Sequence, residues 1–214
     1  MKIIVNFKAK KLAREYPLLR ILTKLLSGDK MKMKTEGIME FWDVYDKFRR
    51  AKGFKVMRGG DKRLAKGEYH LTAHVCVFAP DGRMLVQRRA DFKALWGGLW
   101  DISASGSVLA GESTGEGAER ELFEELGVKT DLRDEQPRAT FYHENCISDY
   151  FVVRADVPLE TVRIQKSEVA EVGYATREEI LAMIDDGRFI PYKKSFIEMM
   201  FDMNEAKDRN MFRL

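Results

Sequence analysis

Three glutamates in the middle of the chain, Glu121, Glu124 and Glu125, are spaced so that a helix would carry all three carboxylates on one face. Like charges at this spacing destabilise a helix by about 0.2–0.5 kcal/mol per pair, so helix stability does not explain them. Carboxylate oxygens gathered within one turn suit a hard divalent cation, Mg²⁺ or Mn²⁺, which keeps open positions for water and substrate phosphates. The spacing therefore predicts a metal site, and a solvated acidic helix face is the weaker hypothesis.

Two further residues are placed to organise this cluster. Arg120 directly precedes it, and Glu112 lies eight residues before Arg120. An ion pair between them would hold a loop against the helix and orient the carboxylates, which is the task of residues that support metal ligands.

The residues around the cluster predict the helix that must carry it. Ser113 is followed three residues later by Glu116, the pattern of a capping box, and Gly127 stands where a left-handed residue would end the helix. Residues four apart form the expected buried stripe: Ala118, Leu122 and Leu126. The sequence therefore predicts a loop that leads into a helix capped at both ends.

The flanking segments predict a sheet with further helices. A turn at Pro80-Asp81-Gly82 predicts a hairpin between strands at 69–78 and 84–89. The other expected strands are 41–46, 53–57, 138–144, 149–155 and 169–175, and the expected closing helices are 176–186 and 192–204. No internal repeat or linker interrupts residues 38–214, so we expect a single α+β domain there.

The first 37 residues differ from the rest in charge. Residues 1–34 carry ten Lys and Arg against Glu15 and Asp29, which gives +8, so the other 180 residues sum to −5 in a chain of net charge +3. Apolar residues recur there at helical spacing, which predicts a basic amphipathic extension over residues 1–37. It would either pack on the body or dock on a membrane surface or a partner. Because the positive charge is confined to it, we do not expect the body to bind nucleic acid.

Composition excludes several other classes of protein. A chain of 214 residues with 45% apolar and 33% charged residues fits one or two soluble domains and not a disordered chain. No window holds the ~18 consecutive apolar residues that a membrane span needs. Cys76 and Cys146 lie far apart without a second ligand pair beside either, so we expect free thiols and a cytoplasmic location.

Residues 106–128 match a known motif without a gap. The run reads Gly, five residues, Glu, seven residues, Arg-Glu, an aliphatic residue, any residue, Glu-Glu, any residue, Gly and an aliphatic residue. It resembles the Nudix box, and the chain resembles the Nudix hydrolase superfamily over about residues 40–205. The resemblance implies an α/β/α sandwich with a mixed β-sheet, in which the box forms a loop–helix–loop catalytic motif. It also implies cleavage of a small-molecule diphosphate joined to another moiety, often a nucleoside.

Carried over by position, the resemblance implies a role for each residue of the motif. The ligands of Mg²⁺ or Mn²⁺ would be Glu121, Glu124, Glu125 and a backbone carbonyl near Gly106. The orienting pair would be Arg120 and Glu112. The metal would lower the pKa of a bound water for attack at phosphorus, and a carboxylate would accept the proton. The candidates for this general base are Glu124, Glu125, Glu168 and Glu171.

The segments that flank the box resemble the isopentenyl-diphosphate-isomerase-like branch of the superfamily. The similar segments are 67–71, 87–89, 96–101, 167–174 and 189–191. The isomerases protonate an alkene with a cysteine, and a nearby histidine helps to hold a metal, whereas Ser105 and Ser107 stand at these positions here. A serine hydroxyl is a far poorer proton donor than a thiol. The isomerases also relax the glutamate-rich box, which is complete here, so both departures favour hydrolysis.

Three residues of these flanks are candidates for substrate binding. Arg88 and Arg89 could each pair a terminal phosphate, but adjacent strand residues point to opposite faces, so at most one of them does, and Arg88 is the one we select. Trp96 and Trp100 could either stack on a base or pack in the core.

We therefore expect a divalent-metal-dependent Nudix hydrolase that cleaves a diphosphate bond in a nucleoside diphosphate derivative or a similar compound. The alternatives are an isopentenyl-diphosphate isomerase-type enzyme and a non-catalytic, nucleotide-sensing Nudix domain. The sensing domain is disfavoured because such proteins tend to lose box carboxylates. The sequence predicts neither the substrate nor whether the protein is a homodimer.

Overall fold

The computed structural model of the chain describes residues 39–60 and 63–205. In chain order its elements are β1 (Phe41–Tyr45), β2 (Ala51–Met57), β3 (His70–Phe78), β4 (Met84–Arg89), β5 (Trp100–Asp101), β6 (Ala104–Ser107), α3 (Thr114–Leu126), β7 (Ala139–Tyr142), β8 (Cys146–Arg154), the 3₁₀ turn η1 (Leu159–Thr161), β9 (Val169–Ala175), α4 (Arg177–Asp185) and α5 (Lys194–Glu205). The predicted basic extension, residues 1–37, lies outside the described residues. Within the described ranges, no helix combines the length and the apolar character that crossing a membrane requires.

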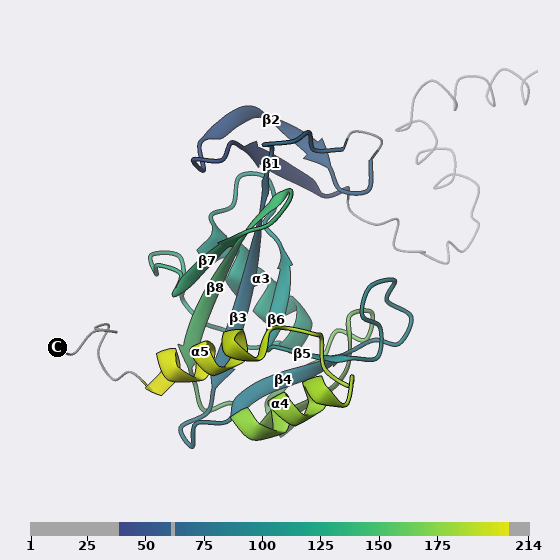
Figure 1. Cartoon of the computed structure of the whole chain (residues 1–214), viewed down its shortest axis with the longest axis vertical. Helices are drawn as coiled ribbons and strands as arrows, with labels where there is room; N and C mark the ends of the chain where they lie inside the picture. The colour runs from purple at the N-terminus through teal and green to yellow at the C-terminus, as the bar shows by residue number, and fades with distance from the viewer. Residues whose placement is uncertain (1–38, 61–62, 206–214) are drawn as a thin grey trace, which may run out of the picture. The chain divides into compact units, whose positions relative to one another are not determined.

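Seven strands form one mixed sheet, shown in Figure 1. Their order is β5-β4-β3-β8-β7, with β6 also paired to β3 and β9 also paired to β4. β3 and β8 run parallel from the pair His70–Cys146 to the pair Phe78–Arg154, and the other pairings among the described strands are antiparallel. β1 and β2 form a separate antiparallel hairpin from the two segments, 41–46 and 53–57, where the sequence predicts strands.

The alternation of side chains along β3 sorts the apolar residues into two cores. Leu71 and Val75 belong to the core that α3 covers, whereas Cys76 and Phe78 belong to the core under α4 and α5. Figure 1 shows the corresponding layers, with α3 behind the sheet and α4 and α5 in front of it. This arrangement confirms the predicted α/β/α sandwich.

β3 and β4 pair over a shorter length than the predicted hairpin implies. The turn forms, with Gly82 N donating to Ala79 O at 2.9 Å, but the two strands pair only at Phe78–Met84. Beyond that pair, β4 turns to β9 and β5, while β3 pairs with β6. The sheet therefore splits between β4 and β6, and this split is where the acidic helix places one of its carboxylates.

The β1–β2 hairpin lies against the loop that leads into α3. Ala110 N donates to Phe41 O, and Gly111 N donates to Asp43 Oδ2, both at 2.7 Å. Through these bonds the hairpin is positioned beside the motif that the sequence analysis singled out.

Candidate active site

Helix α3 begins and ends where the sequence predicts. The Ser113 hydroxyl accepts a hydrogen bond from Glu116 N at 3.2 Å, and the Glu116 carboxylate accepts one from Ser113 N at 2.9 Å. Gly127 closes the helix in the left-handed region, at φ 70°. The predicted stripe of Ala118, Leu122 and Leu126 is fully buried. These constraints fix the rotation of the helix and so the face on which its glutamates lie.

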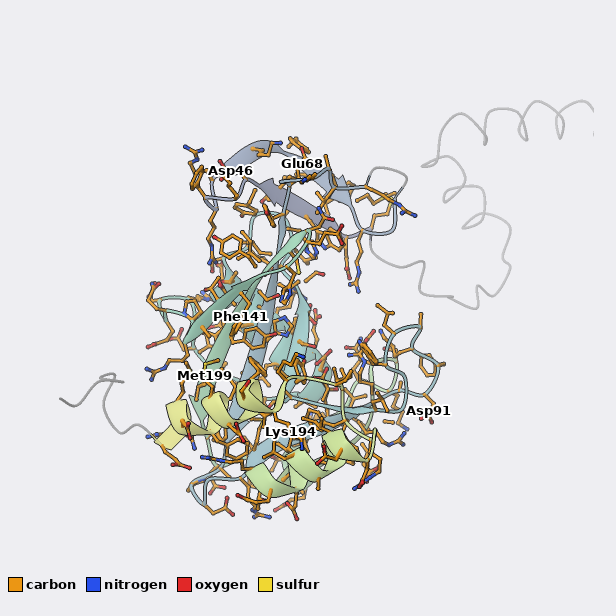
Figure 2. The ribbon with its side chains drawn as sticks, viewed as in Figure 1. Asp46, Glu68, Asp91, Phe141, Lys194 and Met199 are labelled. Atoms are coloured by element: carbon orange, nitrogen blue, oxygen red, sulfur yellow. The ribbon has the colours of Figure 1, made fainter. Side chains whose placement is uncertain are left out.

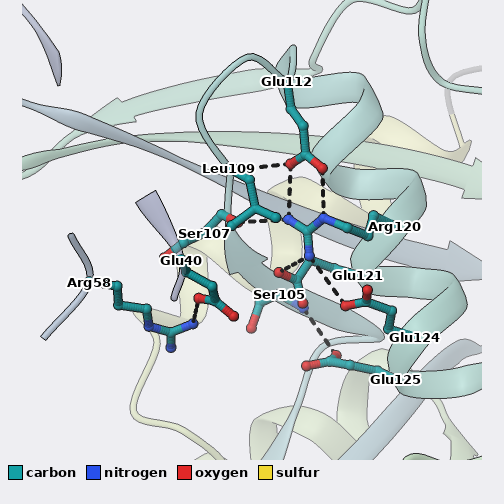
Figure 3. Close-up of polar contacts among 10 residues, drawn as sticks. All are labelled: Glu40, Arg58, Ser105, Ser107, Leu109, Glu112, Arg120, Glu121, Glu124 and Glu125. Carbon is teal, nitrogen blue, oxygen red and sulfur yellow. Dashed lines mark hydrogen bonds and ion pairs between the residues drawn. The ribbon is translucent and has the colours of Figure 1, made fainter. Parts of the chain in front are cut away.

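Arg120 is the centre of the polar network in Figure 3. Its Nε and Nη2 donate to the two oxygens of Glu112 at 2.8 and 3.0 Å, and Nη2 also donates to Ser107 O at 2.9 Å. Nη1 donates to Glu121 at 2.8 Å and, at 3.3 Å, to Glu124. The bond between Arg120 and Glu112 that the sequence suggests is therefore present, and it ties the loop to the helix.

Burial alone would lower the pKa of Arg120, but its hydrogen bonds with Glu112 and Glu121 raise it above its usual value. The guanidinium therefore keeps its charge throughout the pH range in which the protein is folded. It acts as a fixed clamp on the carboxylates around it.

Glu125 lies in the split of the sheet and is 3% exposed. One of its oxygens, Oε2, accepts hydrogen bonds from the Gln87 amide of β4 at 2.7 Å and from Ser105 N of β6 at 3.4 Å. Burial, and then the neighbouring charge of Glu121, raise the pKa of Glu125 to about 8. A buried carboxylate with a raised pKa is characteristic of a functional site.

Gly106 of β6 gives the acidic cluster its space. A Cβ at this position would lie 2.0 Å from Cδ of Glu121 and 2.1 Å from its Oε1. The backbone of β6 and the Glu121 carboxylate are therefore in direct contact, and no side chain could stand between them.

The donor set of this cluster fits a hard divalent cation. Within the described ranges, no group of three Asp, Glu, His or Cys side chains is already arranged to hold a metal ion. Arg120 Nη1 donates to one oxygen of Glu121 and to one oxygen of Glu124. The second oxygen of each carboxylate (Glu121 Oε2, Glu124 Oε1 and Glu125 Oε1) accepts no hydrogen bond from the described residues. Burial also raises the pKa of Glu121, against the opposing effect of Arg120. A cation would relieve the cost of ionising these buried groups.

The cluster opens into a cavity of about 600 Å³. Six of the predicted site residues line it, and Glu112 acts behind them through Arg120. These six are Gly106, Arg120, Glu121, Glu124, Glu125 and Glu168. Helix α3, strand β6 and the segment before β9 thus bring together most of the residues that the sequence predicts.

Three cationic side chains outside the predicted site set line the same cavity, and one of them, Arg89, is the alternative that the sequence leaves open to Arg88. Arg58 follows β2 and pairs with Glu40 at 2.6 Å, and Lys93 pairs with Glu168. Arg89 is the last residue of β4 and lines the cavity, whereas the preceding residue, Arg88, does not. The alternation rule could have identified Arg89, but no pattern in the sequence links Arg58 to the box.

The remaining predicted residues lie outside the lining of the cavity. Arg88 pairs with Glu171 at 3.3 Å and, at 2.7 Å, with Asp91, which Figure 2 labels on the loop after β4. Trp96 lies on that loop, half-exposed and with a positive φ of 57°. Trp100 bridges to Phe189 and packs against the core under α4 and α5, which is the packing alternative for this residue.

Comparison with known proteins identifies the family. The sequence model of the NUDIX domain matches residues 68–196, which is more than half of the chain. The chain is 39% identical over 168 residues to an uncharacterized Nudix hydrolase of Listeria monocytogenes, covering 78% of this chain and 97% of the relative. The chain belongs to the Nudix family.

Two further similarities refine this placement. A crystal structure from Deinococcus radiodurans superimposes with a TM-score of 0.60 at 22% identity, covering 75% of this chain and 97% of that one, and shows that the fold is shared. An isopentenyl-diphosphate Delta-isomerase of Halorhodospira halophila is 46% identical over 78 residues, but these are 36% of this chain and 43% of the isomerase. The family match, the Nudix hydrolase relatives and the shared fold together show that the protein is a hydrolase of the Nudix type. Enzymes of this class generally use divalent metals.

Proposed function

We propose that the protein is a Mg²⁺-dependent hydrolase that cleaves the diphosphate bond of a nucleoside diphosphate derivative or a similar compound. The observation that carries the proposal is the composition of one cavity. It is lined by carboxylates with oxygens that accept no hydrogen bond from the described residues, and by cationic side chains as well. A diphosphate bound to a hard cation needs both kinds of group.

In this proposal Glu121, Glu124 and Glu125 hold the cation, together with a backbone carbonyl near Gly106. When bound, the metal would neutralise the diphosphate and acidify a water for attack at phosphorus. Arg120 and Glu112 would keep the carboxylates oriented, as their hydrogen bonds already do. Mn²⁺ could replace Mg²⁺ because the proposed ligands are all oxygens.

The cationic residues would bind the phosphates. Arg89, Arg58 and Lys93 lie on three different segments of the chain, so they could contact different oxygens of one diphosphate. Arg58 and Lys93 are paired with Glu40 and Glu168 respectively, and a phosphate would compete with these carboxylates.

Two of the four candidates for the general base suit the role by position. Glu124 is half-exposed and Glu168 is about one-third exposed, and both line the cavity. Glu125 is held by Gln87 and Ser105, and Glu171 lies outside the lining. We propose that Glu124 or Glu168 accepts the proton. If Glu168 is the base, Glu168→Gln should abolish the acidic limb of the pH–rate profile, and if Glu124 is the base that limb should remain. Glu168→Gln is the variant that distinguishes them, because Glu124 is also a proposed ligand.

The decisive experiment is a substrate screen with a matched pair of variants. Nucleoside diphosphate derivatives, dinucleotides, coenzymes and isoprenoid diphosphates are incubated with Mg²⁺ or Mn²⁺, and released phosphate or nucleotide is measured. We expect Glu125→Gln to lower kcat by several orders of magnitude, because it removes a ligand and a charge. Glu119→Gln is the control, since Glu119 lies on the same helix but outside the lining.

Two outcomes would contradict the proposal. Unchanged turnover in a folded Glu125→Gln variant would exclude the metal assignment. Double-bond migration in isopentenyl diphosphate, without phosphate release, would favour the isomerase alternative instead.

We propose a cytoplasmic location because both described cysteines are free.

A further inference from the structure

Arg89 is largely buried, yet its guanidinium makes no hydrogen bond to the described residues. Its side chain is 16% exposed where it lines the cavity, and its Nε is buried without a hydrogen-bond partner. In the described part of the chain its one ion pair joins Nη1 to Oδ2 of Asp101 at 3.7 Å, which is too long for a hydrogen bond. Most donors of the guanidinium therefore remain available to an anion in the cavity.

Asp101 of β5 is the acidic partner of Arg89, and its charge also acts on Glu125. It is 1% exposed and does not line the cavity. Its Oδ1 accepts hydrogen bonds from the Tyr192 hydroxyl at 2.9 Å and from Ile102 N at 2.8 Å. These two bonds fix the carboxylate so that its other oxygen, Oδ2, is the one nearest to Arg89.

Tyr192 brings this support from the opposite layer of the sandwich. It lies between α4 and α5, and its ring stacks on Phe196 at 5.2 Å and lies 6.3 Å from Phe189. Aromatic packing of this kind leaves the hydroxyl little freedom. Asp101 is therefore held by a packed side chain that does not line the cavity itself.

A second ion pair with a buried carboxylate, between Arg49 and Asp149, offers a comparison, and here the arginine side chain is 34% exposed. Arg49 binds both carboxylate oxygens of Asp149, with one contact at 3.0 Å, and donates to the Thr114 hydroxyl at 3.4 Å. Hydrogen bonds to Asp149 and Thr114 therefore occupy both Nη groups of the Arg49 guanidinium. Arg89, in contrast, has only the 3.7 Å ion pair with Asp101 Oδ2 among the described residues, so its N–H groups can donate hydrogen bonds to a ligand.

We propose that Asp101 and Tyr192 are positioning residues, which hold the Arg89 guanidinium at the cavity so that it binds a phosphate of the substrate. The inference rests on the proposed function, because it assumes a diphosphate in this cavity. An arginine that is already ordered loses less side-chain entropy on binding than a free one does. Asp101 supplies this order by charge, and Tyr192 supplies it by fixing Asp101.

The test measures binding of inorganic pyrophosphate in the presence of Mg²⁺, by calorimetry on the full chain. We expect Arg89→Met to weaken binding by about tenfold to a hundredfold, since it removes charged hydrogen bonds. Asp101→Asn, which keeps the shape of the side chain and removes its charge, should weaken binding by about threefold to tenfold. Tyr192→Phe, which removes one hydroxyl, should weaken it in the same direction and by less.

A double-mutant cycle separates positioning from a general effect on the fold. If Asp101 acts through Arg89, then Asp101→Asn should cost no further affinity once Arg89→Met is present. In turnover assays Asp101→Asn and Tyr192→Phe should raise KM and leave kcat nearly unchanged. Tyr174→Phe is the matched control, because the Tyr174 hydroxyl donates to Val157 O at 2.9 Å away from the cavity, and it should bind pyrophosphate as the wild type does.

Three results would overturn the inference. They are wild-type pyrophosphate affinity in Arg89→Met, wild-type affinity in both Asp101→Asn and Tyr192→Phe, and independent additive losses in the cycle. Tyr192→Phe keeps the test valid if Asp101→Asn does not fold. Failure of the proposed function is distinguishable, since it would appear as absent hydrolysis of every diphosphate compound whether or not these affinities change as expected.

Discussion

Gly106 is the position at which the missing side chain matters most, because the Glu121 carboxylate occupies the space that a Cβ would fill. We expect Gly106→Ala to push Glu121 away from β6 while leaving the two cores intact. Displacement of a metal ligand by its supporting residues typically costs about 10–100-fold in metal affinity. Mn²⁺ titration of the variant, with circular dichroism as the check on folding, measures this loss. Wild-type Mn²⁺ affinity in Gly106→Ala would show that Glu121 is not a ligand.

Glu125 also makes the stability of the metal-free protein depend on pH. Its pKa is about 8 in the folded protein and 4.5 is its usual value. An acid whose pKa is raised by folding favours the folded state while it is protonated, so this contribution is complete below about pH 4.5. It is lost as the pH rises towards about 8, and no further loss follows above that pH. In EDTA, the free energy of unfolding should therefore fall across this window.

The Glu125→Gln variant isolates this contribution. Urea unfolding at several pH values between 5 and about 8 should show a shallower decline in the variant than in the wild type. The pKa of Glu121 and of Asp101 is also raised by burial, so the difference between the two proteins is the quantity to read. Equal slopes in both proteins would mean that Glu125 is not the group that titrates. Adding Mg²⁺ should restore stability most at high pH, where the carboxylate is ionised.

The sequence predicts the residues within the motif better than those around it. Glu121, Glu124 and Arg120 share one helical turn, so their proximity follows from helix geometry alone. Arg58 and Arg89 reach the same cavity from separate strands. Their placement depends on how those strands pair, which no short-range pattern determines.

At the scale of elements, an ion pair with a buried carboxylate links the β1–β2 hairpin to the sheet, in addition to the bonds that Phe41 and Asp43 make with the loop before α3. Asp149 is fully buried on β8, and its charge is met by Arg49 in the hairpin turn and by the Thr140 hydroxyl at 2.6 Å. Arg49→Met would leave this carboxylate without a cation, at a cost on the order of 3 kcal/mol. We expect faster hydrogen exchange of the β1 and β2 amides in the variant, because the hairpin would open locally.

The neighbouring arginine provides the control for this prediction. Arg50 pairs with Asp46 on the same turn, at 2.7 Å, but its side chain is 72% exposed. An exposed pair contributes little, so Arg50→Met should leave the exchange rates close to those of the wild type. Equal effects of the two substitutions would contradict a specific role for Arg49. A hairpin that opens would also carry Glu40 and Arg58 away from the cavity.

The elements themselves are predicted to different depths. The limits of α3 follow from Ser113 and Gly127, because both caps act through local hydrogen bonds. The separation of β4 from β3 after one residue pair does not follow from the sequence, since alternation along each strand is the same for either partner. β5 and β6, of two and four residues, are too short for a periodic pattern, so the sequence predicts no strand at either place.

At the scale of the described domain, both layers of the sandwich support one cavity. α3 carries the carboxylates from one face, and Tyr192 stabilises the Asp101–Arg89 pair from the other. The split sheet joins them, because Glu125 bonds to Gln87 on β4 and to Ser105 on β6. The two cores therefore fix a site that neither could position alone.

Among the described residues, those that line this cavity fall between Glu40 and Glu168, which leads to a prediction about the basic extension. Removing residues 1–34 changes the net charge from +3 to −5, since that segment carries +8, and it leaves every described lining residue in place. We expect kcat at about 0.15 M salt to stay within about twofold of the full chain. A positive segment can still attract an anionic substrate, and such attraction weakens as salt screens it. A fall in kcat/KM that appears only at low salt would therefore reflect steering, whereas a large loss of kcat at every salt concentration would show that the extension completes the site.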